Sequence, residues 1–166
     1  LMNYKKKNLS EHTEISGVLS PDSKIGIVVS EWNPEITESL SKAAIEALVK
    51  HGIKASNIIL HHVPGSFELP LGAQYLIKNK NTDALICLGC VIQGETRHFE
   101  FICQSVSQHI LRLNLDYNLP VIFGVLTTDN YQQAKDRAGG KHGNKGTEAA
   151  IAAIKMLLLR DQLVCN

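Results

Sequence analysis

The chain has 166 residues, with 17 Lys and Arg against 16 Asp and Glu, and its formal net charge is +1. Hydrophobic residues make up 44% and aromatic residues 5% of the sequence, which is typical of one globular domain and not of a disordered chain. The even charge argues against a dedicated nucleic-acid-binding protein, because such proteins usually carry a basic excess. No apolar run reaches the roughly 18 residues of a membrane span.

Cysteine content and the N-terminal residues both favour a cytoplasmic protein. The four cysteines are too few for a disulfide scaffold at this length. The start of the chain is basic, but no apolar stretch of a secretory signal follows it. Residues 1–23 are polar and irregular, so we predict a flexible tail there, with a short strand around residues 14–18. We hypothesise that this tail pairs with a neighbouring subunit.

From residue 24 onward, short apolar runs alternate with segments of helical periodicity. The apolar runs predict four strands, at 24–30, 57–63, 83–92 and 120–127. The first helix is predicted to begin after Asn33, a suitable N-cap, with Pro34 in its first turn, and to end at Gly52. Further helices are predicted at 67–78, 98–115, 130–138 and 147–163.

Four apolar strands separated by helices indicate βαβ units and a parallel sheet. Right-handed crossovers place helices on both faces of such a sheet. No internal repeat or linker interrupts the pattern. We therefore predict one domain over residues 24–166, with an α/β fold built as a three-layer αβα sandwich.

The candidate site follows from this topology, because ligands of such sheets bind beyond the carboxyl ends of the strands. The predicted strand ends are followed by unusual loops at residues 30–33, 64–68, 93–98 and 127–130. The fold thus gathers the only Trp, a Glu, a His and several glycines at one edge of the sheet. We expect the functional site there.

The third of these loops opens a predicted helix with Gly94, Glu95 and Thr96. Free backbone amides at a helix start suit one phosphate group, although an ordinary turn with Thr96 as the cap explains the same residues. Glu95 stands where a nucleotide-binding phosphate loop needs Lys, which argues against an ATPase or a GTPase. His98 follows in the same helix, either as an acid–base residue or as a surface histidine.

Three other features each allow two interpretations. Trp32 suits stacking on a flat heterocycle or covering of the sheet edge. Glu68 suits ligand hydroxyls or the positive end of a helix. The Gly-rich segment 139–146, predicted as a loop, suits an anionic substrate or a solvated connector. Its neighbourhood carries cationic or titratable side chains, which are Arg137, Lys141, His142 and Lys145.

Metal and redox chemistry find little support. Cys87 and Cys90 match a CxxC spacing, but Cys87 lies in mid-strand, whereas redox motifs open a helix. His61 and His62 are adjacent strand residues whose side chains point to opposite faces, so they do not suit a shared metal ion. We expect no metal site.

Four segments together resemble one enzyme family. They are VPGSFE at 63–68, LGCVIQGETRH at 88–98, PVIFGVLT at 120–127 and RAGGKHGNKG at 137–146. In order and spacing, over about residues 24–163, the chain is similar to the 6,7-dimethyl-8-ribityllumazine synthases. The resemblance implies a flavodoxin-like strand order of 2-1-3-4. It also implies the penultimate step of riboflavin biosynthesis, the condensation of 5-amino-6-(D-ribitylamino)uracil with 3,4-dihydroxy-2-butanone 4-phosphate, with no cofactor.

The resemblance also implies site residues. Trp32 matches the aromatic residue that stacks on the pyrimidine, with Asn33 beside it. His98 matches the proton-transfer residue, and Arg137 matches the arginine that neutralises the phosphate. Among the other matched positions, the segment that contacts the ribityl chain is Ser66, Phe67 and Glu68. The strand end that lines the pyrimidine site is Val91 and Ile92, and the phosphate-binding turn is Gly94, Glu95 and Thr96. The family often has a small residue at Glu95, so we expect that carboxylate to point away from the phosphate.

The resemblance further implies an assembly, because the family builds its site between adjacent subunits of a pentamer. Phe123, Arg137 and Lys145 match positions that the neighbouring subunit contributes, so a monomer would be inactive. Family members form pentamers, pairs of pentamers or icosahedral shells of sixty subunits. The segment 139–146 lacks the insertion linked to members that stop at pentamers, so we expect the shell. Whether a riboflavin synthase associates with it stays open.

Two other functions stay open. A non-catalytic flavin- or lumazine-binding module could share the fold, although intact His98, Arg137 and Lys145 favour an enzyme. A flavodoxin-like or sugar-phosphate-binding protein is disfavoured, because the loop at residues 31–34 is too acidic and bulky for a phosphate.

Overall fold

A four-stranded parallel sheet forms the centre of the protein. The computed structural model describes residue 15 and residues 17–164. The strands lie in the order β2-β1-β3-β4, and their bounds are β1 (Ile25–Ser30), β2 (Ile58–Val63), β3 (Ala84–Ile92) and β4 (Val121–Thr128). The predicted fold class and strand order are confirmed, and each predicted strand is found within one residue of its expected bounds.

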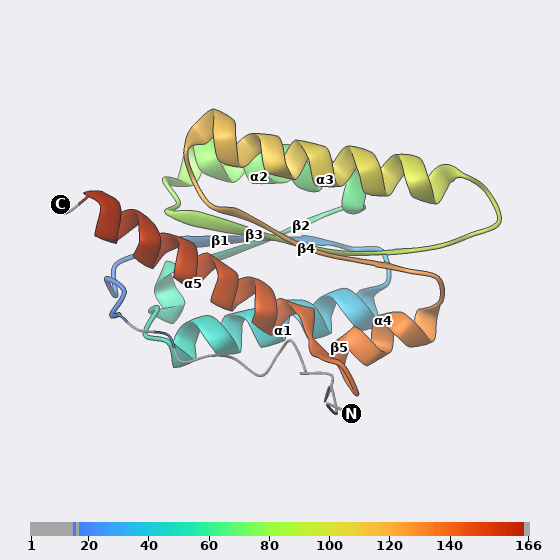
Figure 1. The fold of residues 1–166 in the computed structure, drawn as a ribbon, viewed down its shortest axis with the longest axis horizontal. Coiled ribbons are helices and arrows are strands. Elements are labelled where there is room, and N and C mark those ends of the chain that lie inside the picture. The colour runs from blue at the N-terminus through green and yellow to red at the C-terminus, as the bar shows by residue number, and fades with distance from the viewer. Residues whose placement is uncertain (1–14, 16, 165–166) are drawn as a thin grey trace, which may run out of the picture.

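Helices cover both faces of the sheet (Figure 1). On one face lie α1 (Pro34–Lys50), α4 (Tyr131–Arg137) and α5 (Lys145–Val164). On the other face lie α2 (Leu69–Lys80) and α3 (His98–Tyr117). Two short 3-10 turns, η1 (Ala55–Asn57) and η2 (Ser66–Glu68), precede β2 and α2.

Strand alternation divides the interior into two cores. In β1, Ile25, Ile27 and Val29 pack in the core beneath α1 and α5, whereas Val28 packs in the core beneath α2 and α3. All six residues of β1 are buried, as the continuous apolar run predicts for a central strand. The two central strands therefore have no room for polar chemistry along their length, and functional groups are left to the strand ends.

The Gly-rich segment differs from its prediction. It was expected as a loop, but it contains an antiparallel hairpin of β5 (Ala138–Gly140) and β6 (Gly143–Asn144). The Asn144 side chain then accepts a hydrogen bond from the backbone of Gly146 at 2.8 Å. This side-chain cap begins α5 at Lys145, two residues before the predicted start.

One other helix start and one helix cap also differ in detail. Residues 66–68 form the 3-10 turn η2, so α2 begins at Leu69 and not at residue 67. The N-cap of α3 is Arg97 and not Thr96. Asn130 caps α4 by accepting a hydrogen bond from the backbone of Gln133 at 2.9 Å, in a helix close to the predicted one.

The tail predicted over residues 1–23 falls only partly on the described part of the chain, because residues 1–14 and 16 lie outside it. The strand expected around residues 14–18 falls partly on those residues. Within the described part, Leu19 is buried and belongs to the core beneath α1 and α5.

Close packing of α5 on α1 leads to a stability prediction. A Cβ atom built on Gly146 would lie 1.9 Å from the backbone oxygen of Leu40, so one helix would have to shift. We expect Gly146→Ala to lower the free energy of unfolding by about 1–3 kcal/mol or more, measured by urea denaturation. Gly94→Ala is the matched control, because nothing lies within 4 Å of its Cβ position. Equal stability of Gly146→Ala and the parent chain would show that the contact does not constrain the packing.

Candidate active site

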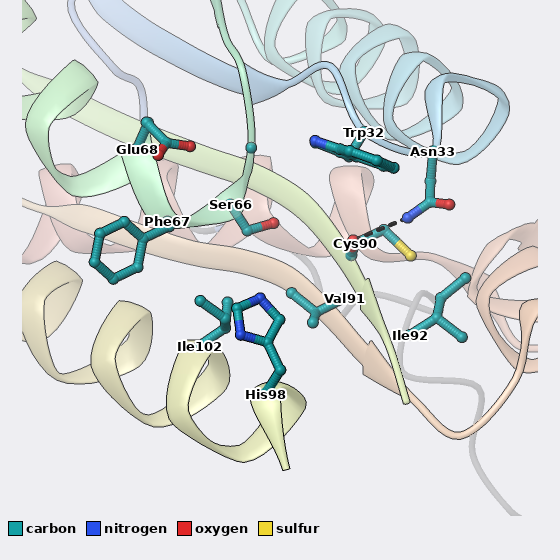
Figure 2. A pocket seen from close by; sticks show the side chains of 11 residues that line it. Trp32, Asn33, Ser66, Phe67, Glu68, Cys90, Val91, Ile92, His98 and Ile102 are labelled. Atoms are coloured by element: carbon teal, nitrogen blue, oxygen red, sulfur yellow. Dashed lines mark hydrogen bonds between the residues drawn. The ribbon is translucent and has the colours of Figure 1, made fainter. Parts of the chain in front are cut away.

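A cavity of about 470 Å³ opens at the carboxyl ends of β1, β2 and β3. The segments after these strands and the start of α3 supply its walls (Figure 2). It brings together eight of the predicted site residues, which are Trp32, Asn33, Ser66, Phe67, Glu68, Val91, Ile92 and His98. Gly65, Cys90 and Ile102 complete the lining. Sequence reasoning missed Ile102, although it lies one helical turn after His98 and so faces the same way.

Two aromatic side chains are open to a ligand. Trp32 is 72% exposed and Phe67 is 58% exposed, an unusual state for large apolar rings. In Figure 2, Trp32 and His98 lie on opposite sides of the cavity. This arrangement suits a flat heterocycle stacked on the indole with a proton-transfer group within the same cavity.

One polar side chain of the cavity lining is buried. Ser66 is buried and lines the cavity. Its hydroxyl, like that of the neighbouring buried Ser30, has no hydrogen-bond partner among the described residues. The two hydroxyl oxygens lie 2.6 and 3.2 Å from the position of a Cβ atom on Gly89. A side chain at Gly89 would thus displace both hydroxyls, which leaves glycine as the residue that fits there.

Glu68 adds an acceptor at the same end of the cavity. One of its carboxylate oxygens lies 3.1 Å from the Cβ position of Gly65, and the Trp32 ring lies 3.4 Å from that position on another side. A carboxylate beside an open indole can accept hydrogen bonds from ligand hydroxyls while the ring of the ligand stacks.

The predicted phosphate turn lies between β3 and α3. Gly94, Glu95 and Thr96 are all exposed and are not part of the cavity wall. The Gln93 side chain donates to the Gly94 carbonyl at 2.8 Å and reaches the Thr96 carbonyl at 3.5 Å. These contacts fix the backbone carbonyl groups of Gly94 and Thr96 in the turn.

Three further predicted residues meet elsewhere. Phe123, Arg137 and Lys145 line a second cavity of about 270 Å³ along β4, at the opposite edge of the sheet from β2. This cavity shares no lining residue with the first. Within one chain, the predicted site is therefore divided into two parts.

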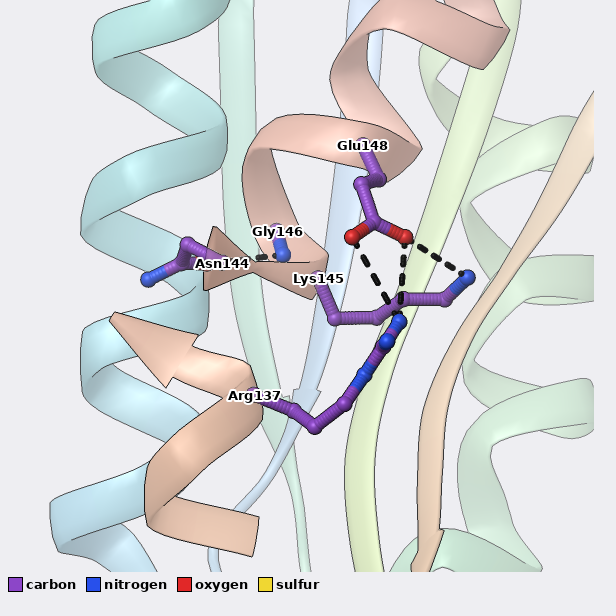
Figure 3. Close-up of polar contacts among 5 residues, drawn as sticks. All are labelled: Arg137, Asn144, Lys145, Gly146 and Glu148. Atoms are coloured by element: carbon purple, nitrogen blue, oxygen red, sulfur yellow. Dashed lines mark hydrogen bonds and ion pairs between the residues drawn. The ribbon is translucent and has the colours of Figure 1, made fainter. Parts of the chain in front are cut away.

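Glu148 holds the two cations of the second cavity (Figure 3). Its carboxylate lies 3.3 Å from the Arg137 guanidinium and 3.2 Å from the Lys145 ammonium. The Glu148 side chain is only 10% exposed, so water screens these contacts less than it screens surface pairs. Sequence reasoning missed Glu148, and the available signal was its place three residues after Lys145 in a helix.

The comparisons with known proteins agree with the motifs. Residues 22–161 match the family model described as 6,7-dimethyl-8-ribityllumazine synthase. A protein of that name from Cytophaga hutchinsonii is 63% identical over 157 residues, which cover 94% of this chain and 98% of the relative. The chain belongs to the lumazine synthase family. Relatives of the same name from Porphyromonas gingivalis and Flavobacterium johnsoniae are 55% and 54% identical, covering 90% and 97% of this chain and 92% and 85% of theirs.

One cation assignment changes in this member of the lumazine synthase family. Lys141 was grouped with Arg137 and Lys145, but its ammonium pairs with Asp136 at 2.9 Å and lines neither cavity. The hydrogen bond from Lys141 lowers the pKa of Asp136.

The CxxC cysteines sit in the interior of β3. Burial raises the pKa of Cys87 to about 12 and that of Cys90 to about 11, so both thiols stay protonated near neutral pH and are poor nucleophiles. Among the described residues, no three His, Cys, Asp or Glu side chains group closely enough to hold a metal ion. The described helices also include none with an apolar stretch long enough to cross a bilayer.

Proposed function

We propose that this chain condenses 5-amino-6-(D-ribitylamino)uracil with 3,4-dihydroxy-2-butanone 4-phosphate to give 6,7-dimethyl-8-ribityllumazine, phosphate and water. The observation that carries the proposal is the cavity in which Trp32, Glu68 and His98 meet at the ends of three strands. It offers a stacking face, an acceptor for hydroxyls and a proton-transfer group. The family supplies the reaction, and no metal or organic cofactor is needed for it.

The pyrimidine substrate is proposed to fill the first cavity. Its ring stacks on Trp32 and lies against Val91 and Ile92 at the end of β3. Its ribityl chain extends toward Ser66 and Phe67, where Glu68 accepts hydrogen bonds from the hydroxyls. This placement leaves the two ring amino groups near the mouth of the cavity, on the side of His98.

The chemistry consists of proton transfers and loss of two kinds of leaving group. The 5-amino group attacks the ketone, and loss of water gives an imine. Phosphate then leaves, the resulting enol tautomerises, and the ribityl-bearing nitrogen closes the ring with loss of a second water. Holding both substrates together supplies much of the rate, while His98 accepts and returns protons.

We propose that a neighbouring copy completes the site with its second cavity. Arg137 and Lys145 carry two positive charges against the one negative charge of Glu148, so the cluster has positive charge to spare for a phosphate. Phe123 and Lys145 then lie against the pyrimidine end, and the backbone amides of Gly94, Glu95 and Thr96, with the Thr96 hydroxyl, bind the phosphate from the first copy.

The assembly expected for the chain follows from this division. Helix α3 exposes three large apolar side chains, Phe101, Leu111 and Leu115, which favours contact between copies. We propose a homo-oligomer of pentamers, an icosahedral shell of sixty subunits, in the cytoplasm, with the residue 1–23 tail pairing with a neighbour. Association with a riboflavin synthase is compatible with such a shell.

Turnover of the two substrates tests the proposed function, with His98→Ala as the decisive variant. Loss of the imidazole should lower kcat by about 10²–10³-fold or less, because general acid–base catalysis contributes on that order. His109→Ala is the control on the same helix, since its ring contacts the Ser105 carbonyl at 2.7 Å and lies outside the cavity. Full activity of His98→Ala would remove His98 from the mechanism, and a wild-type chain that binds lumazine without turnover would be a binding module.

Arg137→Ala should act mainly on the phosphorylated substrate. Loss of a charge-assisted contact to phosphate should raise the KM for the butanone phosphate by about 10–100-fold, with a smaller change in the KM for the pyrimidine. Lys135→Ala removes the same charge two residues earlier, where the lysine pairs with Glu35 at 2.8 Å outside the second cavity. Similar KM values in Arg137→Ala and Lys135→Ala would contradict the assignment.

A further inference from the structure

Asn33 has an unusual backbone for the residue that opens α1. Its φ and ψ angles are both 57°, in the left-handed region that few non-glycine residues adopt. In this conformation its carbonyl accepts hydrogen bonds from the backbones of Ile36 at 2.9 Å and Thr37 at 3.0 Å. The N-cap predicted at Asn33 is found, but its side chain makes no capping hydrogen bond.

The free side-chain amide crosses to the central sheet instead. It donates to the backbone oxygen of Cys90 in β3 at 3.1 Å (Figure 2). Pairing of β1 with β3 ends at Val29 and Leu88, so beyond that point the β3 edge that faces β1 has no partner strand, while β4 still pairs with the other edge. The Asn33 amide takes the place of the next rung. Because Cys90 is 3% exposed and sits in the sheet interior, this contact ties the β1–α1 loop to a rigid point.

Trp32 lies between two such ties. On its N-terminal side, the backbone of Glu31 donates to the Val63 carbonyl at 2.9 Å. On its C-terminal side is the contact from Asn33 to Cys90. With 72% of the residue exposed, Trp32 has little packing to fix its ring. Apart from the close approach of Gly65 to the ring, its position over the cavity therefore depends on its backbone.

We propose that Asn33 is a positioning residue that fixes the Trp32 ring over the cavity before substrate arrives. The amide contact and the left-handed backbone act together, and Asn supplies both, since it tolerates this conformation and carries a donor of the right length. The role goes beyond contact with substrate, because it operates in the ligand-free protein. Its effect on substrate affinity rests on the proposed stacking of the pyrimidine on Trp32.

Two substitutions distinguish the contribution of the Asn33 side-chain amide from that of its left-handed backbone. Asn33→Gly keeps the left-handed conformation and removes the side chain. Asn33→Asp keeps the size and shape, but its carboxylate has no proton to donate to a carbonyl. Both remove the contact to Cys90. Asn81→Gly is the matched control, because Asn81 has a similar φ of 51° at the end of α2, outside both cavities.

Trp32 is the only tryptophan of the chain, so its fluorescence reports the ring directly. Time-resolved anisotropy of the ligand-free protein should show a larger fast component in Asn33→Gly and in Asn33→Asp than in the parent. The KM for the pyrimidine substrate should rise by about 3–10-fold, the effect of one hydrogen bond, while kcat changes by less than about 2-fold. Asn81→Gly should move neither quantity, and urea denaturation establishes that each variant is folded.

The combination of anisotropy and KM decides whether Asn33 acts as a positioning residue. A raised KM with unchanged anisotropy in both variants would mean that Asn33 contacts substrate directly, which overturns the proposal. Unchanged anisotropy with unchanged KM would overturn it as well. A mobile ring without a change in KM would support the positioning role of Asn33 and overturn the proposed stacking of the pyrimidine on Trp32. If the parent chain failed to turn over substrate, the proposed function would fall, while the anisotropy comparison would still decide whether Asn33 holds the ring. If Asn33→Gly did not fold, Asn33→Asp would carry both measurements.

Discussion

Burial of the two central strands on both faces is the constraint on which this molecule depends. A strand whose side chains all meet a helix layer must be mostly apolar, and all six residues of β1 are buried, with Ser30 at its carboxyl end as its one polar side chain. Catalytic groups are thereby excluded from the body of the sheet. The side chains proposed to bind substrate or transfer protons, Trp32, Glu68 and His98, lie where strands stop and the backbone turns toward a helix.

The same constraint explains why one chain holds its candidate site in two parts. Strands β1, β2 and β3 end around one cavity, whereas β4, as an edge strand, supports a second one with α4 and α5. The first cavity has aromatic and hydroxyl-binding groups. The second has Arg137 and Lys145 held by a nearly buried carboxylate. A reaction between a neutral heterocycle and a phosphorylated sugar fragment needs both kinds of group, and an edge that faces a neighbour can supply the missing kind.

Much of this could be predicted from the sequence, because strands and helices follow hydrophobic periodicity. The strand bounds and the residues around the first cavity are of this kind. The hairpin over residues 138–144 could not be predicted, since its three glycines leave no side-chain pattern and it depends on positive φ angles at Gly139 and Gly143. The long-range contact of Asn33 also escaped prediction. Asn33 reaches a carbonyl 57 residues away, and local sequence carries no record of such a partner.

In the proposed assembly the two cavities of neighbouring copies form one site, and mixing two defective chains tests this arrangement most directly. His98→Ala chains and Arg137→Ala chains are refolded together, and turnover is measured at a low concentration of the butanone phosphate. If each site is shared between two copies, each of its two halves is intact in about half of the cases in an equal, random mixture. About a quarter of the sites then combine an intact His98 with an intact Arg137, so activity should rise well above that of either variant. Activity no greater than the average of the two separate variants would place both halves of each working site in a single chain.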